Sequence, residues 1–88
     1  MTTLAVCTVY YVNSDPVNSG KFLLTVAIAG IVPGNLVDEA IQISNVDPAI
    51  TSALLEQAIK QAVKDQLTTH WGYTFGLFDD VRLINALL

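Results

Sequence analysis

The chain has 88 residues, with four lysines and arginines against eight aspartates and glutamates, and its formal net charge is −4. Hydrophobic residues make up 52% of it and charged residues only 14%, whereas ordinary domains carry about 25% charged residues. The length favours a single domain over residues 1–88, and a domain this small has much surface to cover. We therefore expect apolar surface to remain after the monomer folds and to be buried against another protein chain.

The positions of the charged residues exclude several classes of partner. The four basic residues, Lys21, Lys60, Lys64 and Arg82, are dispersed along the chain. Nucleic acids and anionic membranes both attract clustered Lys and Arg, so we expect neither as a partner. The apolar run after Lys21 has eleven residues, and a membrane-spanning helix needs about 20. No signal-peptide pattern is apparent, so a cytoplasmic or virion location is the default expectation.

Residues 3–32 are predicted to form an antiparallel hairpin. Two runs rich in β-branched and aromatic residues, 3–12 and 21–32, flank the turn-forming stretch NSDPVNSG at 13–20. We expect that stretch to be an exposed hairpin tip, with a binding loop as the alternative.

Both faces of this hairpin are apolar. The alternation predicts that Leu4, Val6, Thr8, Tyr10 and Val12 share one face of the first strand, and that Phe22, Leu24, Val26 and Ile28 share one face of the second. The opposite face of the second strand carries mostly smaller side chains, which would let another layer approach closely: Leu23, Thr25, Ala27, Ala29 and Ile31. A hairpin apolar on both faces must be covered on both, and one helix covers only one.

Residues 33–46 are predicted to be a linker with a short strand. The sequence VPGN at 32–35 is a strong turn signal. The stretch LVDEAIQIS at 36–44 suits either a short helix or a strand, and the alternation in its second half favours a strand over 39–44. Its charges would suit the edge of a sheet.

Residues 47–70 are predicted to form one long amphipathic helix. Asp47 is expected as the N-cap, with Pro48 at the first helical position and Gly72 as the stop. Apolar residues recur at spacings of one, three and four, which predicts a single broad buried stripe: Ile50, Leu54, Leu55, Ala58, Ile59, Ala62, Val63 and Leu67.

The remaining residues, 71–88, are predicted to be an aromatic turn followed by a C-terminal strand. The aromatic residues of WGYTFGLF either cap the open end of the core or form an exposed anchor for a partner. Asp79 and Asp80 suggest a turn. The final run VRLINALL suits a strand or a helix, and a fourth strand would widen the floor beneath the helix. The predicted fold is therefore α+β: a small, mostly antiparallel sheet with one long helix packed on one face.

The sequence carries no recognisable catalytic or ligand-binding motif. Its one histidine, His70, is expected near the helix end in a structural role, and its one cysteine, Cys7, is expected in the core. The acidic pairs at 38–39 and 79–80 match neither a catalytic dyad nor a calcium loop. We expect no catalytic residue, no cofactor and no metal site.

Three functions are compatible with this pattern. The favoured one is a non-enzymatic subunit that associates with copies of itself, as in a ring, a filament, or a phage or viral particle. Another structural protein of the same assembly is a second candidate partner. Its interface is expected to comprise Leu23, Thr25, Ala27, Ala29, Ile31, Trp71, Tyr73 and Phe75. The second is a small adaptor for one different protein. The third is a small enzyme or ligand-binding domain around His70.

Overall fold

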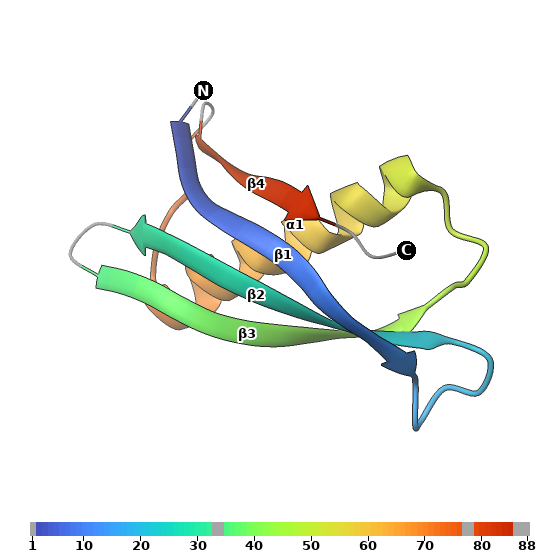
Figure 1. Ribbon diagram of the computed structural model, residues 1–88. Helices are drawn as coiled ribbons and strands as arrows, with labels where there is room; N and C mark the ends of the chain where they lie inside the picture. Colours follow the sequence, from blue (N-terminus) through green and yellow to red (C-terminus); the bar gives the residue numbers. More distant parts are fainter. Residues whose placement is uncertain (1, 33–34, 77–78, 86–88) are drawn as a thin grey trace.

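The computed structural model describes residues 2–32, 35–76 and 79–85. In these residues the chain forms four strands and one helix, in the order β1 (Thr2–Ser14), β2 (Phe22–Val32), β3 (Asn35–Val46), α1 (Ser52–Trp71) and β4 (Asp79–Asn85) (Figure 1). The strands lie side by side as β3-β2-β1-β4, with β1–β2 and β2–β3 antiparallel and β4 parallel to β1. The prediction of an α+β fold with a mostly antiparallel sheet is confirmed.

The helix crosses one face of the sheet because of this strand order. β3 and β4 occupy opposite edges, so the segment that joins them must pass over β2 and β1. α1 is that segment, and Figure 1 shows it behind the sheet, on one side only. The other face of the sheet is turned toward the viewer.

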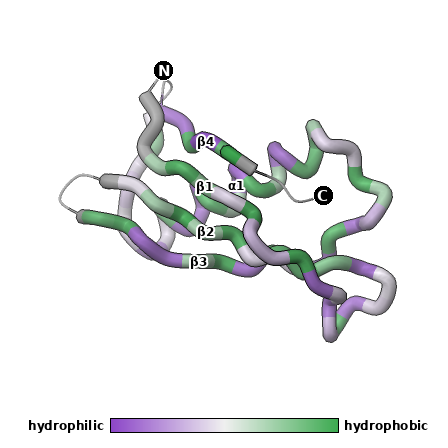
Figure 2. Tube along the Cα trace, in the orientation of Figure 1, coloured by the Kyte–Doolittle hydropathy of each residue, from purple (hydrophilic) through white to green (hydrophobic). Residues whose placement is uncertain are grey.

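The core lies between this helix and the sheet. Alternate residues of β2, Leu24, Val26 and Ile28, are completely buried, as the alternation predicts. They meet one residue per helical turn of α1, at a constant spacing of four: Leu55, Ile59, Val63 and Leu67. Cys7 is buried beside them on β1, as expected. Figure 2 shows hydrophobic residues concentrated on β1 and β2, with hydrophilic stretches on the edge strand β3.

The predicted start of the helix was wrong. The chain first makes a turn, in which the N–H of Ile50 donates to the carbonyl of Asp47 and the N–H of Ala49 donates to the Asp47 carboxylate. Pro48 thus lies in a tight turn directly after Asp47. The fixed φ of proline suits this position in a turn as well as it suits the first position of a helix, so the residue type alone does not distinguish the two. The N-cap is Thr51, whose hydroxyl accepts from the N–H of Leu54. The predicted stop at Gly72 is confirmed, in the left-handed conformation with φ of 70°.

The buried stripe of α1 is narrower than predicted. Leu54 is 56% exposed and Ala58 is also exposed, whereas Leu55 and Ile59 are buried. A helix that lies on a single sheet face buries only the residues pointing straight at it, so the flanks of the apolar stripe stay in solvent.

A β-bulge in β1 overturns the predicted faces of the first strand. Val9 pairs with Val26 but Tyr11 pairs with Thr25, so Tyr10 is the extra residue. Beyond a bulge the alternation changes phase. Val12 therefore packs against the core, and Tyr11 takes the place on the opposite face that a regular strand would give to Tyr10.

The third and fourth strands also differ from the prediction. β3 runs over Asn35–Val46 and pairs with β2 along nearly its whole length, whereas a strand over 39–44 was expected. The expected turn at 32–35 includes residues 33–34, which lie outside the described residues. The strand preferred for the end of the chain is confirmed over Asp79–Asn85, and residues 86–88 lie outside the described residues. Asp79 and Asp80 begin this strand, and the N–H of Asp79 also donates to the carbonyl of Gly76 at 3.2 Å, as at the end of a turn.

Candidate interaction surface

The sheet face turned away from α1 is the main candidate for function. Among the described residues, the one helix packs on the other side, and this face contacts solvent. We call it the open face. Its members include Val6, Thr8 and Tyr11 of β1, Leu23, Thr25, Ala27 and Ala29 of β2, Leu36, Asp38, Ala40 and Gln42 of β3, and Arg82 of β4.

One row of the open face crosses all four strands. Asp38 lies directly opposite Ala29, Ala29 lies opposite Val6, and Val6 lies opposite Arg82. Directly paired residues point to the same side of a sheet. An acidic side chain at one edge and a basic side chain at the other therefore enclose two small apolar ones, and both charged residues are exposed.

The neighbouring row is made of short side chains. Ala40 pairs with Ala27, and Ala27 pairs with Thr8. The next row contains Gln42, Thr25 and Tyr11, and Tyr11 is 55% exposed. The centre of the open face is therefore low, and its taller side chains stand toward the ends of the strands.

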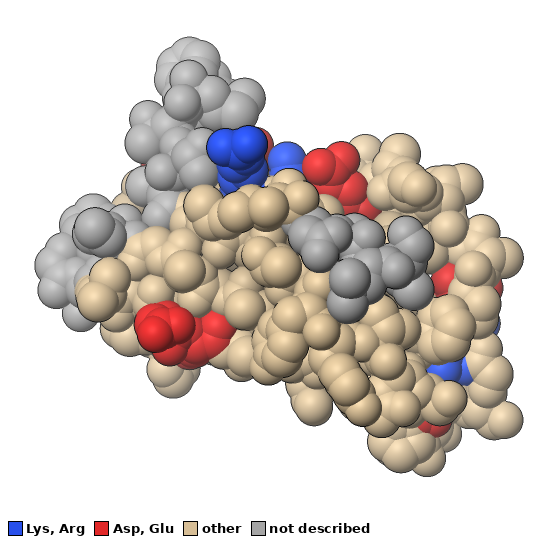
Figure 3. Space-filling view, in the orientation of Figure 1, with Lys and Arg blue, Asp and Glu red and all other residues tan. Residues whose placement is uncertain are grey.

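The centre of the open face carries no charge among its described members. Figure 3 views this face in the orientation of Figure 1: acidic atoms appear near the β3 edge, basic atoms appear near the β4 edge with further acidic atoms beside them, and the described atoms between the two edges are mainly uncharged. An uncharged patch bounded by charged residues resembles the core and rim of a protein interface.

The structure does not bring the eight predicted interface residues together. Leu23, Thr25, Ala27 and Ala29 lie on the open face, and the side chain of Ile31 lies outside the described residues. The three aromatic residues pack against the core on the helix side of the sheet instead. The aromatic segment therefore does not extend the open face.

The aromatic residues are held by contacts that close one end of the core. Trp71 donates its Nε1–H to Oε1 of Glu39 at 2.8 Å. Tyr73 donates to Asp79 at 2.9 Å, and this hydrogen bond raises the pKa of Tyr73. Phe75 packs edge-on against Tyr73. Capping the core was one of the two roles expected for this segment, and these contacts correspond to that role.

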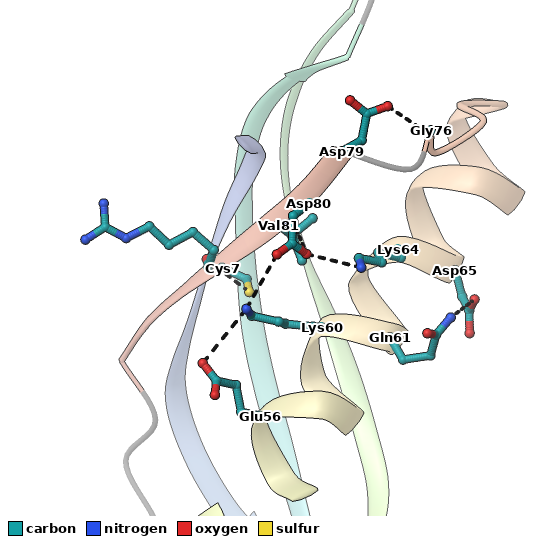
Figure 4. A network of polar contacts seen from close by, with 11 residues as sticks. Cys7, Glu56, Lys60, Gln61, Lys64, Asp65, Gly76, Asp79, Asp80 and Val81 are labelled. Atoms are coloured by element: carbon teal, nitrogen blue, oxygen red, sulfur yellow. Dashed lines mark hydrogen bonds and ion pairs between the residues drawn. The ribbon is translucent and has the colours of Figure 1, made fainter. Parts of the chain in front are cut away.

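An ion-pair cluster joins α1 to β4 (Figure 4). Lys64 lies 3.1 Å and Lys60 lies 3.8 Å from carboxylate oxygens of Asp80, and Lys60 is also 4.0 Å from Glu56. Partial burial acts to raise the pKa of Asp80, but the hydrogen bonds from Lys64 and the Val81 N–H and the charges of both lysines outweigh it. The pKa therefore lies below its ordinary value, and the cluster stabilises the contact between helix and edge strand.

The chain matches no protein-family model, and no similar protein was found among curated sequences or solved structures.

The one cysteine and the one histidine of the chain lie away from the open face. Cys7 is fully buried, which raises the pKa of its thiol. His70 is exposed in the last turn of α1, with its ring edge-on to Trp71 at 5.5 Å. The described part of the chain contains no pocket and no cluster of three or more potential metal ligands. Within that same part, no helix is long and apolar enough to cross a membrane.

Several members of the open face were not predicted from the sequence as site residues. Val6 and Thr8 were predicted to share a face of the first strand, but that face was not linked to a face of the second strand. The bulge that brings Tyr11 onto the same side as Val6 and Thr8 was not predicted. Asp38 and Arg82 are 44 positions apart, and only the observed pairing of four strands puts them in one row. The alternation within one strand signals which residues share a face, but it does not signal the register between strands.

Proposed function

We propose that this chain is a non-catalytic subunit that associates with copies of itself through the open face, as a building block of a larger homo-oligomeric assembly. The observation that carries the proposal is a four-stranded sheet with a helix on one face and, on the other, a surface whose centre is low and uncharged. Sheets whose two faces are both apolar are normally covered on both.

The chemistry of the open face suits another sheet as its cover. Two sheets pack face to face about 10 Å apart, and short side chains at the centre permit such an approach. Four strands about 4.8 Å apart, each contributing about nine residues at about 3.3 Å, present on the order of 600 Å² per copy. Two copies then bury about 1,200 Å² together, which reaches the lower limit of stable protein interfaces.

The experiment that tests this proposal is sedimentation velocity on an Ala27→Glu variant. Ala27 lies at the centre of the open face, so a carboxylate there would be buried without a partner in the assembly. We expect Ala27→Glu to sediment as a 9.5 kDa monomer with an unchanged circular dichroism spectrum. Ala58→Glu, on the exposed side of α1, is the matched control and should associate as the wild type does. Equal association of both variants would contradict the proposal.

A second candidate function, an adaptor for one different protein, is favoured by the β1–β2 loop. Val17 at its tip is 86% exposed, while Asp15 holds the loop in one conformation through hydrogen bonds to the N–H groups of Val17 and Asn18. A preordered loop with an exposed apolar residue suits recognition by another chain. Val17→Ser should leave self-association unchanged. If Val17→Ser dissociated the assembly while Ala27→Glu did not, the loop would replace the open face as the binding surface.

A further inference from the structure

We infer that two copies of the chain meet as a closed two-fold pair, in which Asp38 of each copy forms an ion pair with Arg82 of the other. This inference rests on the proposed self-association and adds its geometry. It depends on the one row of residues that crosses all four strands of the open face.

The two charges of this row are exposed and separated within one copy. Asp38 and Arg82 stand on strands three spacings apart, which is about 14 Å at 4.8 Å per spacing. The ion pairs of the described residues involve Asp80, Glu56, Lys60 and Lys64 and neither of these two. Both side chains are exposed, so each can reach a group on another molecule.

A two-fold axis that runs along the strands, midway between two stacked open faces, satisfies both charges at once. Rotation about this axis places β3 of one copy over β4 of the other and β2 over β1. The row of one copy then lies over the same row of the second copy in the opposite order. Asp38 therefore faces Arg82 of the second copy, and Ala29 faces Val6 of the second copy. The same contact occurs twice, as an isologous interface requires.

The heights of the side chains are compatible with this arrangement. Under the same rotation Ala27 lies over Thr8 of the second copy, so short residues meet at the centre. Stacked twisted sheets cross at about −30°, and a long arginine at the rim can follow this rotation. The ion pairs then lie at the edges of an apolar contact, where charges set orientation more than affinity.

Two competing arrangements are less compatible with the structure. A face-to-face stack that continues beyond two copies would need two uncovered sheet faces in each copy, but α1 covers one of them. Pairing of β3 edge to edge would bring the acidic residues of two edge strands together, and like charges on an edge discourage such pairing. A closed pair through the open face avoids both problems.

The test uses charge reversal at the two positions. In Asp38→Arg, two arginines face each other at both contacts, and in Arg82→Asp, two aspartates do. We expect each variant alone to associate at least about tenfold more weakly than the wild type. Asp38→Arg has an arginine at both positions, and Arg82→Asp has an aspartate at both. In an equimolar mixture, each arginine of the first variant can face an aspartate of the second, so the two variants should form a heterodimer. The double variant Asp38→Arg/Arg82→Asp should associate with nearly wild-type affinity.

Salt dependence provides a second readout that does not rely on charge reversal. The wild-type dissociation constant should rise with ionic strength, and this rise should be smaller in the neutral pair Asp38→Asn/Arg82→Gln. A wild-type chain that stays monomeric would contradict the proposed function itself. A wild-type chain that associates, is dissociated by Ala27→Glu, and yet shows no heterodimer in the mixture would overturn only the two-fold pairing.

Discussion

The carboxylate of Asp15 accepts a hydrogen bond of 2.7 Å from the backbone N–H of Asn45, thirty residues further along the chain. The same carboxylate accepts from the N–H groups of Val17 and Asn18 and from the side-chain amide of Asn18. Asn45 stands at the end of β3 with a left-handed φ of 58°. Asp15 therefore fixes the β1–β2 loop to the edge strand at one end of the sheet.

We expect Asp15→Asn to lower the midpoint of thermal unfolding more than Asp47→Asn does. The charged Asp15 side chain is satisfied by four N–H donors, and an amide replaces one acceptor oxygen by a donor that faces them. The Asp47 carboxylate, in contrast, accepts one hydrogen bond, from the backbone N–H of Ala49 in an exposed turn. Circular dichroism melting curves of the two variants provide the measurement, and equal shifts would contradict the role assigned to Asp15.

The same contact predicts a pH dependence of stability. Hydrogen bonds from Asn45, and then from Asn18 and Val17, hold the pKa of Asp15 well below its ordinary range. A depressed folded-state pKa adds stability above the unfolded-state value of about 3.9, and this stability is lost as pH falls below it. The difference in unfolding midpoint between wild type and Asp15→Asn should therefore be full at about pH 6 and shrink toward about pH 2. If this difference in unfolding midpoint grew as the pH was lowered, the prediction would be contradicted.

The observed helix start predicts the cost of removing its cap. Thr51→Ala should lower the free energy of unfolding by about 1 kcal/mol, because the N–H of Leu54 loses its acceptor. Thr51→Ser keeps the hydroxyl and should cost less. Chemical denaturation of both variants tests this assignment. If Asp47→Ala proved more destabilising than Thr51→Ala, the helix would begin earlier, at Pro48.

Two adjacent leucines test which side of α1 faces the sheet. Leu55 is 4% exposed and Leu54 is 56% exposed. Leu55→Ala should cost about 2–5 kcal/mol, as for other buried leucines, whereas Leu54→Ala should change stability by about 0.5 kcal/mol or less. Urea unfolding of the pair provides a comparison with matched chemistry. Similar losses for both would mean that the buried stripe is as broad as the sequence pattern suggested.

The sequence predicted those parts of the fold that depend on local patterns. The alternation in β2 correctly separated Leu24, Val26 and Ile28 from the residues of the opposite face, and the left-handed stop at Gly72 was correctly placed. Local signals were misleading where one residue type serves two structures. Asp47 and Pro48 suit a helix start and a tight turn equally well. The bulge at Tyr10 is not visible in the sequence, because the residues on both sides of it are apolar or aromatic.

The candidate site was predicted only in part, because it depends on the register between distant strands. Leu23, Thr25, Ala27 and Ala29 were expected together from one alternation. The alignment of Asp38 with Arg82 required two antiparallel pairings and one parallel pairing, and no short-range pattern specifies these. The aromatic segment was assigned to the interface by composition, but its hydrogen bonds to Glu39 and Asp79 direct it to the core.

The molar mass of the wild-type chain in solution, measured by sedimentation velocity over a range of micromolar concentrations, decides whether the chain associates with copies of itself. Association through the open face requires a mass that rises with concentration to at least twice 9.5 kDa. A species that stays at 9.5 kDa over the whole range would contradict it.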